Sequence, residues 1–232
     1  AWTLITLFSC RWLHQPLIVP EAILPGIWEL GTVPPARGVF RCGFATVGLL
    51  LSCTVRMYES LVLVPHLSET TAEGQAWVTA CAGYMAAAGL AVQGLCSLDT
   101  GSCSKMTLRV LLHVAGSLAF LLGSAWHART FLKICNELSH TGLGASIVFQ
   151  VAMLLRQLLA FCAFAIGVGG PLAFAASRLS DRFDSMAFGG LSREKVPGLK
   201  SFIALWQWVL VVNFALFYCT YTLDFWVILR PV

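Results

Sequence analysis

The sequence predicts an all-α fold, a multi-pass bundle of transmembrane helices. Of the 232 residues, 58% are hydrophobic and only 11% are charged, whereas soluble domains carry roughly 25% charged residues. The apolar residues form long unbroken blocks rather than recurring at every third or fourth position. Only helices and closed barrels satisfy every backbone polar group in hydrocarbon, and these blocks lack the alternation of barrel strands. We therefore expect one integral membrane domain over residues 1–232.

Five blocks are long enough to cross a bilayer, which takes about 20 apolar residues. They cover residues 39–64, 75–96, 107–128, 146–176 and 201–229. A partial sixth block at the amino end, residues 1–10, is interrupted by Arg11 and His14 before it reaches that length. Glycines at 167, 169 and 170 with Pro171 predict a kink or a helix end near Pro171. The charged segment 177–200 is expected to be the principal solvated loop.

The segment before the first full block carries a motif. It reads Leu24-Pro25-Gly26-Ile27-Trp28-Glu29-Leu30-Gly31-Thr32-Val33-Pro34-Pro35, with Phe40 soon after. It resembles the first loop of the Frag/DRAM/Sfk family of six-span membrane proteins, which has the form L-P-x-I-S-x-x-G-x-x-P-P-E. Trp28 and Ala36 stand where that family has Ser and Glu.

Further matches extend the resemblance over residues 20–226. Residues 35–41 are similar to the P-x-R-x-x-W-R stretch of the Golgi factor that remodels GPI anchors. His113 with Gly116 resembles the family's H-x-x-G helix, and residues 217–225 resemble its closing aromatic stretch.

The resemblance implies a non-catalytic lipid-pathway or membrane-organising factor, related to GPI-anchor remodelling, phosphoinositides or autophagy. It also implies an endomembrane location, in the Golgi, the lysosome or the plasma membrane. An alternative is an accessory structural subunit of a large membrane assembly, in an organellar inner or other energy-transducing membrane. The many tryptophans and the lack of a reaction centre favour that alternative. A third class is a small transporter or channel using Arg56, Arg156 and Asp224.

Basic residues are distributed unevenly between the two sides of the predicted bundle. The first, third and fifth loops hold ten of them, against three on the other side. The ten are Arg11, Arg37, Arg41, Lys105, Arg109, Arg178, Arg182, Arg193, Lys195 and Lys200, and the three are Arg129, Lys133 and Arg230. The positive-inside rule places the first loop in the cytosol, matrix or stroma. The family resemblance implies the lumenal side instead, so both orientations stay open.

Four arginines are the candidate lipid-binding residues. Arg37 and Arg41 lie four residues apart on one helical face just after the paired prolines, so they can clamp one anionic phospholipid or simply lie in the headgroup layer. Arg56 can pair with Glu59, three residues on, or bind a headgroup. Arg156 lies deep in its block, and we expect it to contact a buried carboxylate, a carbonyl or a lipid phosphate.

No motif indicates catalysis, a metal or a cofactor. We find no Cys-x-x-Cys, no Glu-x-x-His, no phosphate-binding glycine loop and no nucleophile elbow. His113 and His127 are expected to be hydrogen-bonded between helices, Asp224 to contact a neighbouring helix, and the nine cysteines to be free thiols. The expected partners are membrane lipids. If the protein is an accessory subunit, other membrane protein subunits are expected as well. No nucleic-acid partner is expected.

Two further expectations concern packing. Small residues in the second and third full blocks, including Gly83, Ala87, Gly116 and Gly123, predict that these helices contact each other closely. Aromatic residues of the last block are expected in interfacial belts. They are Trp206, Trp208, Tyr221 and Trp226.

Overall fold

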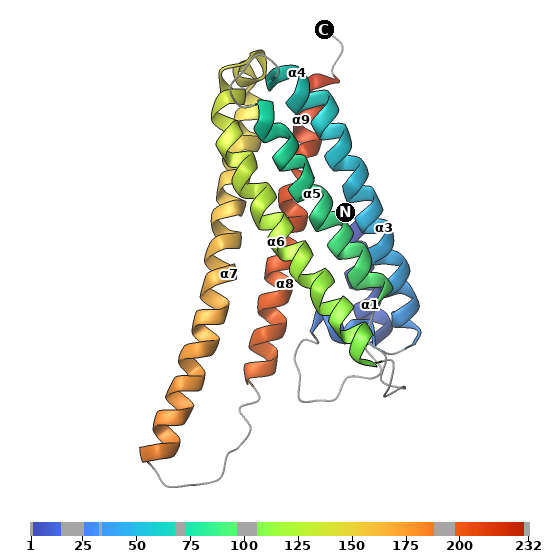
Figure 1. Ribbon diagram of the computed structural model, residues 1–232, viewed down its shortest axis with the longest axis vertical. Coiled ribbons are helices and arrows are strands. Elements are labelled where there is room, and N and C mark those ends of the chain that lie inside the picture. Colours follow the sequence, from blue (N-terminus) through green and yellow to red (C-terminus); the bar gives the residue numbers. More distant parts are fainter. Residues whose placement is uncertain are drawn as a thin grey trace.

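The computed structural model describes residues 2–14, 26–32, 34–67, 73–96, 106–187 and 198–229, and these residues contain helices and turns but no strand (Figure 1). The helices are α1 (Trp2–His14), α2 (Ile27–Leu30), α3 (Ala36–Tyr58), α4 (Val64–Leu67), α5 (Glu73–Leu95), α6 (Met106–Ser139), α7 (Ile147–Ala187), α8 (Gly198–Cys219) and α9 (Tyr221–Ile228). A π-helical turn, Glu59–Leu63, joins α3 to α4, and a 3-10 turn, Gly142–Ala145, precedes α7. The predicted all-α fold is confirmed.

Five helices in the described part of the chain are long and apolar enough to cross a membrane. They are Ala36–Leu67, Gly74–Leu95, Leu108–Cys135, Ile147–Gly169 and Ala204–Ile228. Each overlaps one of the five predicted blocks, so the five spans are confirmed. Helix α1 has 13 residues and packs against α3.

The long helices alternate in direction, so their ends gather at two ends of the bundle (Figure 1). One end, here called the α2 end, holds α2, the starts of α3, α6 and α8, and the ends of α5 and α7. The opposite end, the α4 end, holds α4 and α9. The helices that flank the first, third and fifth loops therefore meet at one end, as an antiparallel bundle requires.

Helices α5 and α6 approach closely because glycines face each other across their contact. A Cβ atom added at Gly89 would lie 2.4 Å from the Phe120 backbone nitrogen, and one at Gly116 would lie 2.8 Å from the Gly89 carbonyl oxygen. A Cβ at Gly123 would lie 2.6 Å from the Ala86 nitrogen. The predicted small-residue contact between these helices is confirmed.

Two predictions about the last two spans are wrong. Of the kink or helix end predicted near Pro171, the helix end is wrong: α7 runs on to Ala187, so the first part of the predicted loop 177–200 is helical. Residues 188–197 of that loop lie outside the described residues. Tyr221 is fully buried and Trp208 is 9% exposed, so neither belongs to an interfacial belt, whereas Trp226 is 58% exposed.

Candidate functional site

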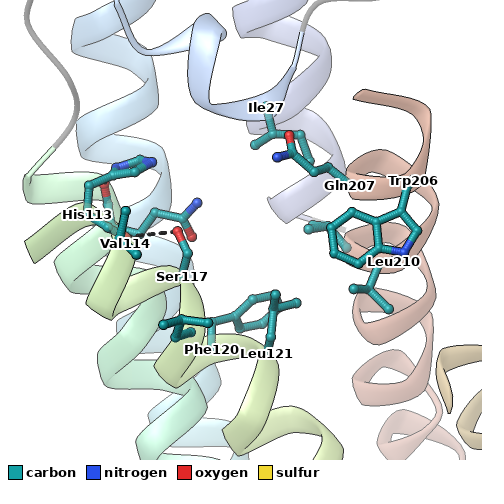
Figure 2. A pocket seen from close by; sticks show the side chains of 12 residues that line it. Ile27, His113, Val114, Ser117, Phe120, Leu121, Trp206, Gln207 and Leu210 are labelled. Carbon is teal, nitrogen blue, oxygen red and sulfur yellow. Dashed lines mark hydrogen bonds between the residues drawn. The ribbon is translucent and has the colours of Figure 1, made fainter. Parts of the chain in front are cut away.

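A cavity of about 410 Å³ lies between α6 and α8 toward the α2 end. Figure 2 shows His113 and Ser117 of α6 on one side and Trp206, Gln207 and Leu210 of α8 on the other. The full lining is Ile27, Gln93, His113, Val114, Ser117, Leu118, Phe120, Leu121, Trp206, Gln207, Leu210 and Val211. Ile27 belongs to α2 and Gln93 to α5, so four helices enclose the space.

The cavity exists because α6 and α8 are drawn to different neighbours. Helix α6 is held against α5 by the glycine contacts described above. Helix α8 is held against α7, because the Trp206 indole N–H donates to the Ile166 carbonyl at 2.7 Å and the Asn213 amide donates to the Leu159 carbonyl at 2.8 Å. The two helices meet deeper in the bundle, where the Phe120 and Phe214 rings make an edge contact with centroids 5.9 Å apart. Toward the α2 end from that contact, the space between them stays open.

The polar groups of the cavity come from three helices. His113 is 5% exposed, and its Nδ1 lies 3.2 Å from the Gln93 carbonyl oxygen, to which it donates because a carbonyl can only accept. The Ser117 hydroxyl donates to the His113 carbonyl at 2.9 Å. The buried Oε1 of Gln207 accepts no hydrogen bond from the described residues. Deeper in the cavity the lining is apolar, from Phe120, Leu121, Leu210 and Val211.

A second cavity of about 310 Å³ lies beside the first. Its lining includes Trp2 of α1, Leu51 of α3 and Tyr218 of α8, and it shares Phe120 and Val211 with the first cavity. These two side chains therefore form the partition between the two spaces.

A buried ion pair closes the bundle toward the α4 end. Arg156 of α7 places Nη1 at 2.8 Å from Oδ2 of Asp224 of α9, and both side chains are fully buried. Arg156 also donates from Nε to the Thr220 hydroxyl at 2.7 Å and from Nη2 to the Thr220 carbonyl at 2.9 Å. The Tyr58 hydroxyl of α3 donates to the same Asp224 oxygen at 2.5 Å. Three of the membrane-crossing helices are thus tied together by one charge pair.

Aromatic rings surround the Arg156 guanidinium. Its Cζ lies 4.9 Å from the ring centroids of Phe131 and Tyr221, within the range of a cation–π interaction. His127 of α6 bonds to the Tyr221 hydroxyl through Nε2 and to the Thr79 carbonyl through Nδ1 at 2.6 Å. The expectation that both histidines are hydrogen-bonded between helices is confirmed. The side chains of this cluster line neither of the two cavities described above.

The structure separates the four candidate arginines. Arg37 donates from Nε and Nη2 to the Thr32 carbonyl, at 3.2 and 2.5 Å, so it ties the start of α3 to the preceding turn. Arg41 lies one helical turn further along α3 and is half-buried. Whether the two hold an anionic lipid stays a prediction.

The other two arginines lie far from that pair. Arg56 pairs with Glu59 at 3.0 Å, which confirms the predicted pair, and its side chain is 69% exposed. The Tyr84 hydroxyl donates to the same Glu59 oxygen at 3.2 Å. Arg156 contacts a buried carboxylate and a carbonyl, two of the three partners expected of it. In this arrangement its side chain has no exposed surface to offer a lipid.

The eight described cysteines form no disulfide, and no cluster of metal-binding side chains occurs among the described residues. Cys103 lies outside them.

Sequence reasoning missed the cavity, and it expected a buried carboxylate beside Arg156 without identifying Asp224 as that carboxylate. Arg156 and Thr220 are 64 residues apart, so no local spacing connects their helices. One signal was present: an arginine and an aspartate in different apolar blocks each need a counter-charge in hydrocarbon. No comparable signal marks a cavity, because its walls come from four helices.

Comparison with protein families places the chain. The family model of the Frag1/DRAM/Sfk1/Cwh43P N-terminal domain matches residues 2–228. No curated protein and no solved structure gives a significant match. The match covers all the described helices, including those that build the cavity and the ion pair. The chain therefore belongs to the Frag1/DRAM/Sfk1/Cwh43P family of integral membrane proteins.

Proposed function

We propose that this protein binds a membrane lipid in the α6/α8 cavity and acts as a non-catalytic lipid-pathway or membrane-organising factor. The observation that carries the proposal is the cavity itself, which is lined mainly by apolar side chains and has a few polar ones toward the α2 end. Its volume of about 410 Å³ falls in the range of ligand pockets.

The cavity borders the bilayer. Val114 and Leu118 line it and are also 49% and 51% exposed, on a helix that is long and apolar enough to cross the membrane. Lipid is the ligand present at the highest concentration on that surface. A cavity of this size encloses one chain or ring system and leaves the rest of the lipid in the bilayer.

The family match supports the coarser part of the proposal, an integral membrane protein. The endomembrane location and a role in GPI-anchor remodelling, phosphoinositide organisation or autophagy rest on the motif resemblance. The lipid in the cavity would be held and presented rather than chemically changed, since we find no nucleophile and base paired in the cavity lining.

A second candidate function, an accessory subunit of a larger assembly, is favoured by α7. Its membrane-crossing part is the least buried of the five spans in the described residues, with Leu158, Phe161 and Phe164 exposed. A partner helix covering that face would remain bound through gentle purification at fixed stoichiometry. Purification with no such partner removes this candidate.

The lipid proposal is tested by filling the cavity. Ser117→Phe places a ring in the space, whereas Ala115→Phe adds the same ring two residues away at an exposed position that does not line it. Native mass spectrometry of the protein released from membranes should show a bound lipid in the wild type and in Ala115→Phe, and its loss in Ser117→Phe. Equal lipid in all three would contradict the proposal.

A further inference from the structure

We infer that the α6/α8 cavity selects a neutral lipid whose polar end is a hydroxyl, as in a sterol or a diacylglycerol, over an anionic phospholipid. This inference rests on the proposed function, since it names the class of lipid that the same cavity takes. It is carried by the polar groups of the lining and by where the nearby cations lie.

The buried amide of Gln207 supplies the recognition. Its Oε1 is shielded from the surroundings and receives no hydrogen bond from the described residues, although buried polar atoms are normally paired. Figure 2 shows this side chain reaching from α8 into the space opposite His113. Because this Oε1 has almost no accessible surface, a ligand donor reaches it only when the amide turns toward the cavity, and the new hydrogen bond would then stabilise the complex.

A hydroxyl fits this position better than other lipid groups do. An amide side chain presents an acceptor or, turned over, a donor, and a hydroxyl can donate and accept. An ester carbonyl or an ionised phosphate oxygen can only accept, so it can pair with the amide NH₂ but not with Oε1. The other polar side chains of the lining are the Gln93 amide, the Ser117 hydroxyl and the Trp206 indole, which are uncharged, and His113, whose ring bonds to the Gln93 carbonyl.

The described residues that line the cavity include no Asp, Glu, Lys or Arg. Arg109 lies one helical turn before His113 and is exposed, and Arg37 donates to the Thr32 carbonyl. A phosphate placed at Gln207 would be enclosed without a cation among the lining residues, and burying an unpaired charge is strongly unfavourable.

The apolar part of the ligand would lie deeper, along Phe120, Leu121 and Leu210. The Phe120–Phe214 contact marks the deep end of the space between α6 and α8. The hydroxyl therefore points toward the α2 end and the apolar body toward the bilayer centre.

Photolabelling of the full chain in phosphatidylcholine nanodiscs tests the inference. The panel pairs lipids that differ in one group: a photoreactive sterol and its methyl ether, and a photoreactive diacylglycerol, its 3-acetyl ester and the corresponding phosphatidic acid. Each is applied to wild type, to Gln207→Met, which removes the amide at similar length, and to the control Gln157→Met, an exposed position on α7.

We expect at least one hydroxyl lipid to label peptides of the cavity about fivefold more than its capped partner, as one neutral hydrogen bond of about 1 kcal/mol implies. Which of the two hydroxyl lipids labels identifies the sterol or the diacylglycerol as the source. Gln207→Met should abolish the preference and Gln157→Met should keep it.

The inference would be overturned if the hydroxyl lipids label the cavity no more than their methyl ether or acetyl ester, or if phosphatidic acid labels it more than diacylglycerol does. Either result would leave the lipid proposal standing. If no lipid labels the cavity peptides, the proposed function itself fails. If Gln207→Met does not fold, the labelling of the wild-type protein by the hydroxyl lipids and by their methyl ether or acetyl ester still tests the inference.

Discussion

Replacing Arg156 by methionine removes a positive charge from the interior while keeping a side chain of similar length. The replacement deletes the 2.8 Å contact with Asp224 and both hydrogen bonds to Thr220. Asp224 then keeps the Tyr58 hydroxyl on Oδ2, while its buried Oδ1 has no hydrogen-bond partner among the described residues. The change therefore strands a carboxylate inside a membrane protein.

The magnitude follows from two opposing terms. At 2.8 Å and an effective dielectric of 20, the attraction between the two charges is ~6 kcal/mol. Removing each ion from water costs several kcal/mol, which opposes this attraction. The intact pair therefore contributes little net stability compared with an apolar pair. Removing one partner leaves the desolvation of the other uncompensated and should lower the free energy of unfolding by about 3–5 kcal/mol.

The double variant separates this account from a simple packing effect. Arg156→Met combined with Asp224→Leu removes both charges, and it should recover most of the stability lost in Arg156→Met. Reversible unfolding of the purified protein in mixed micelles, titrated with SDS, measures all the variants. Arg56→Met is the matched control, because that side chain is 69% exposed, and we expect no measurable loss from it. If the stability lost in the double variant equals the sum of the losses in Arg156→Met alone and in Asp224→Leu alone, the two charges do not compensate each other and this explanation is wrong.

Three further predictions use the same stability assay or lipid analysis. Tyr58→Phe removes the hydroxyl that donates to Asp224 at 2.5 Å and should lower the free energy of unfolding by about 1.5–3 kcal/mol. The control Tyr84→Phe removes the hydroxyl that donates to Glu59, the partner of Arg56, and should have a smaller effect. Equal losses in the two variants would count against the buried network. Gly89→Ala should destabilise the protein by about 1–3 kcal/mol because the added Cβ would lie 2.4 Å from the Phe120 nitrogen. The control Gly38→Ala should not destabilise it, because no heavy atom lies within 4 Å of the Cβ added there. A stable Gly89→Ala variant would show that α5 and α6 can move apart. Arg37→Ala with Arg41→Ala should reduce the anionic phospholipid that co-purifies, measured by quantitative lipid mass spectrometry, and an unchanged amount would show that the pair does not clamp a headgroup.

Much of the fold could be predicted from the sequence because the bilayer imposes simple rules. An apolar run of about 20 residues has few alternatives to a membrane-crossing helix. Local spacing was also enough to predict the ion pair of Arg56 and Glu59, which are three residues apart. The α5–α6 contact was predictable because small residues mark places where helix backbones approach closely.

The failures have physical causes as well. The charged residues from Arg178 onward predict a loop, but no glycine or proline lies between 178 and 187, and a helix that leaves the membrane can carry charges. Pro171 does not end α7. The residue type of Tyr221 predicts an interfacial position, whereas its place next to Thr220 and near Asp224 puts it in the buried network.

The candidate site was the least predictable part. Its polar residues, Gln93, His113, Ser117 and Gln207, come from three helices. A cavity depends on how far apart helices are held, here by the hydrogen bonds of Trp206 and Asn213 to α7. These bonds join residues 40 and 54 positions apart, which no local pattern reveals.

Electron cryomicroscopy of the protein in lipid nanodiscs, enlarged by a bound antibody fragment, can show directly whether a lipid occupies the space between α6 and α8. We expect elongated non-protein density between Leu121 and Leu210, with its polar end at Gln207. A map in which α8 packs directly on α6 and leaves no density between them would contradict this expectation.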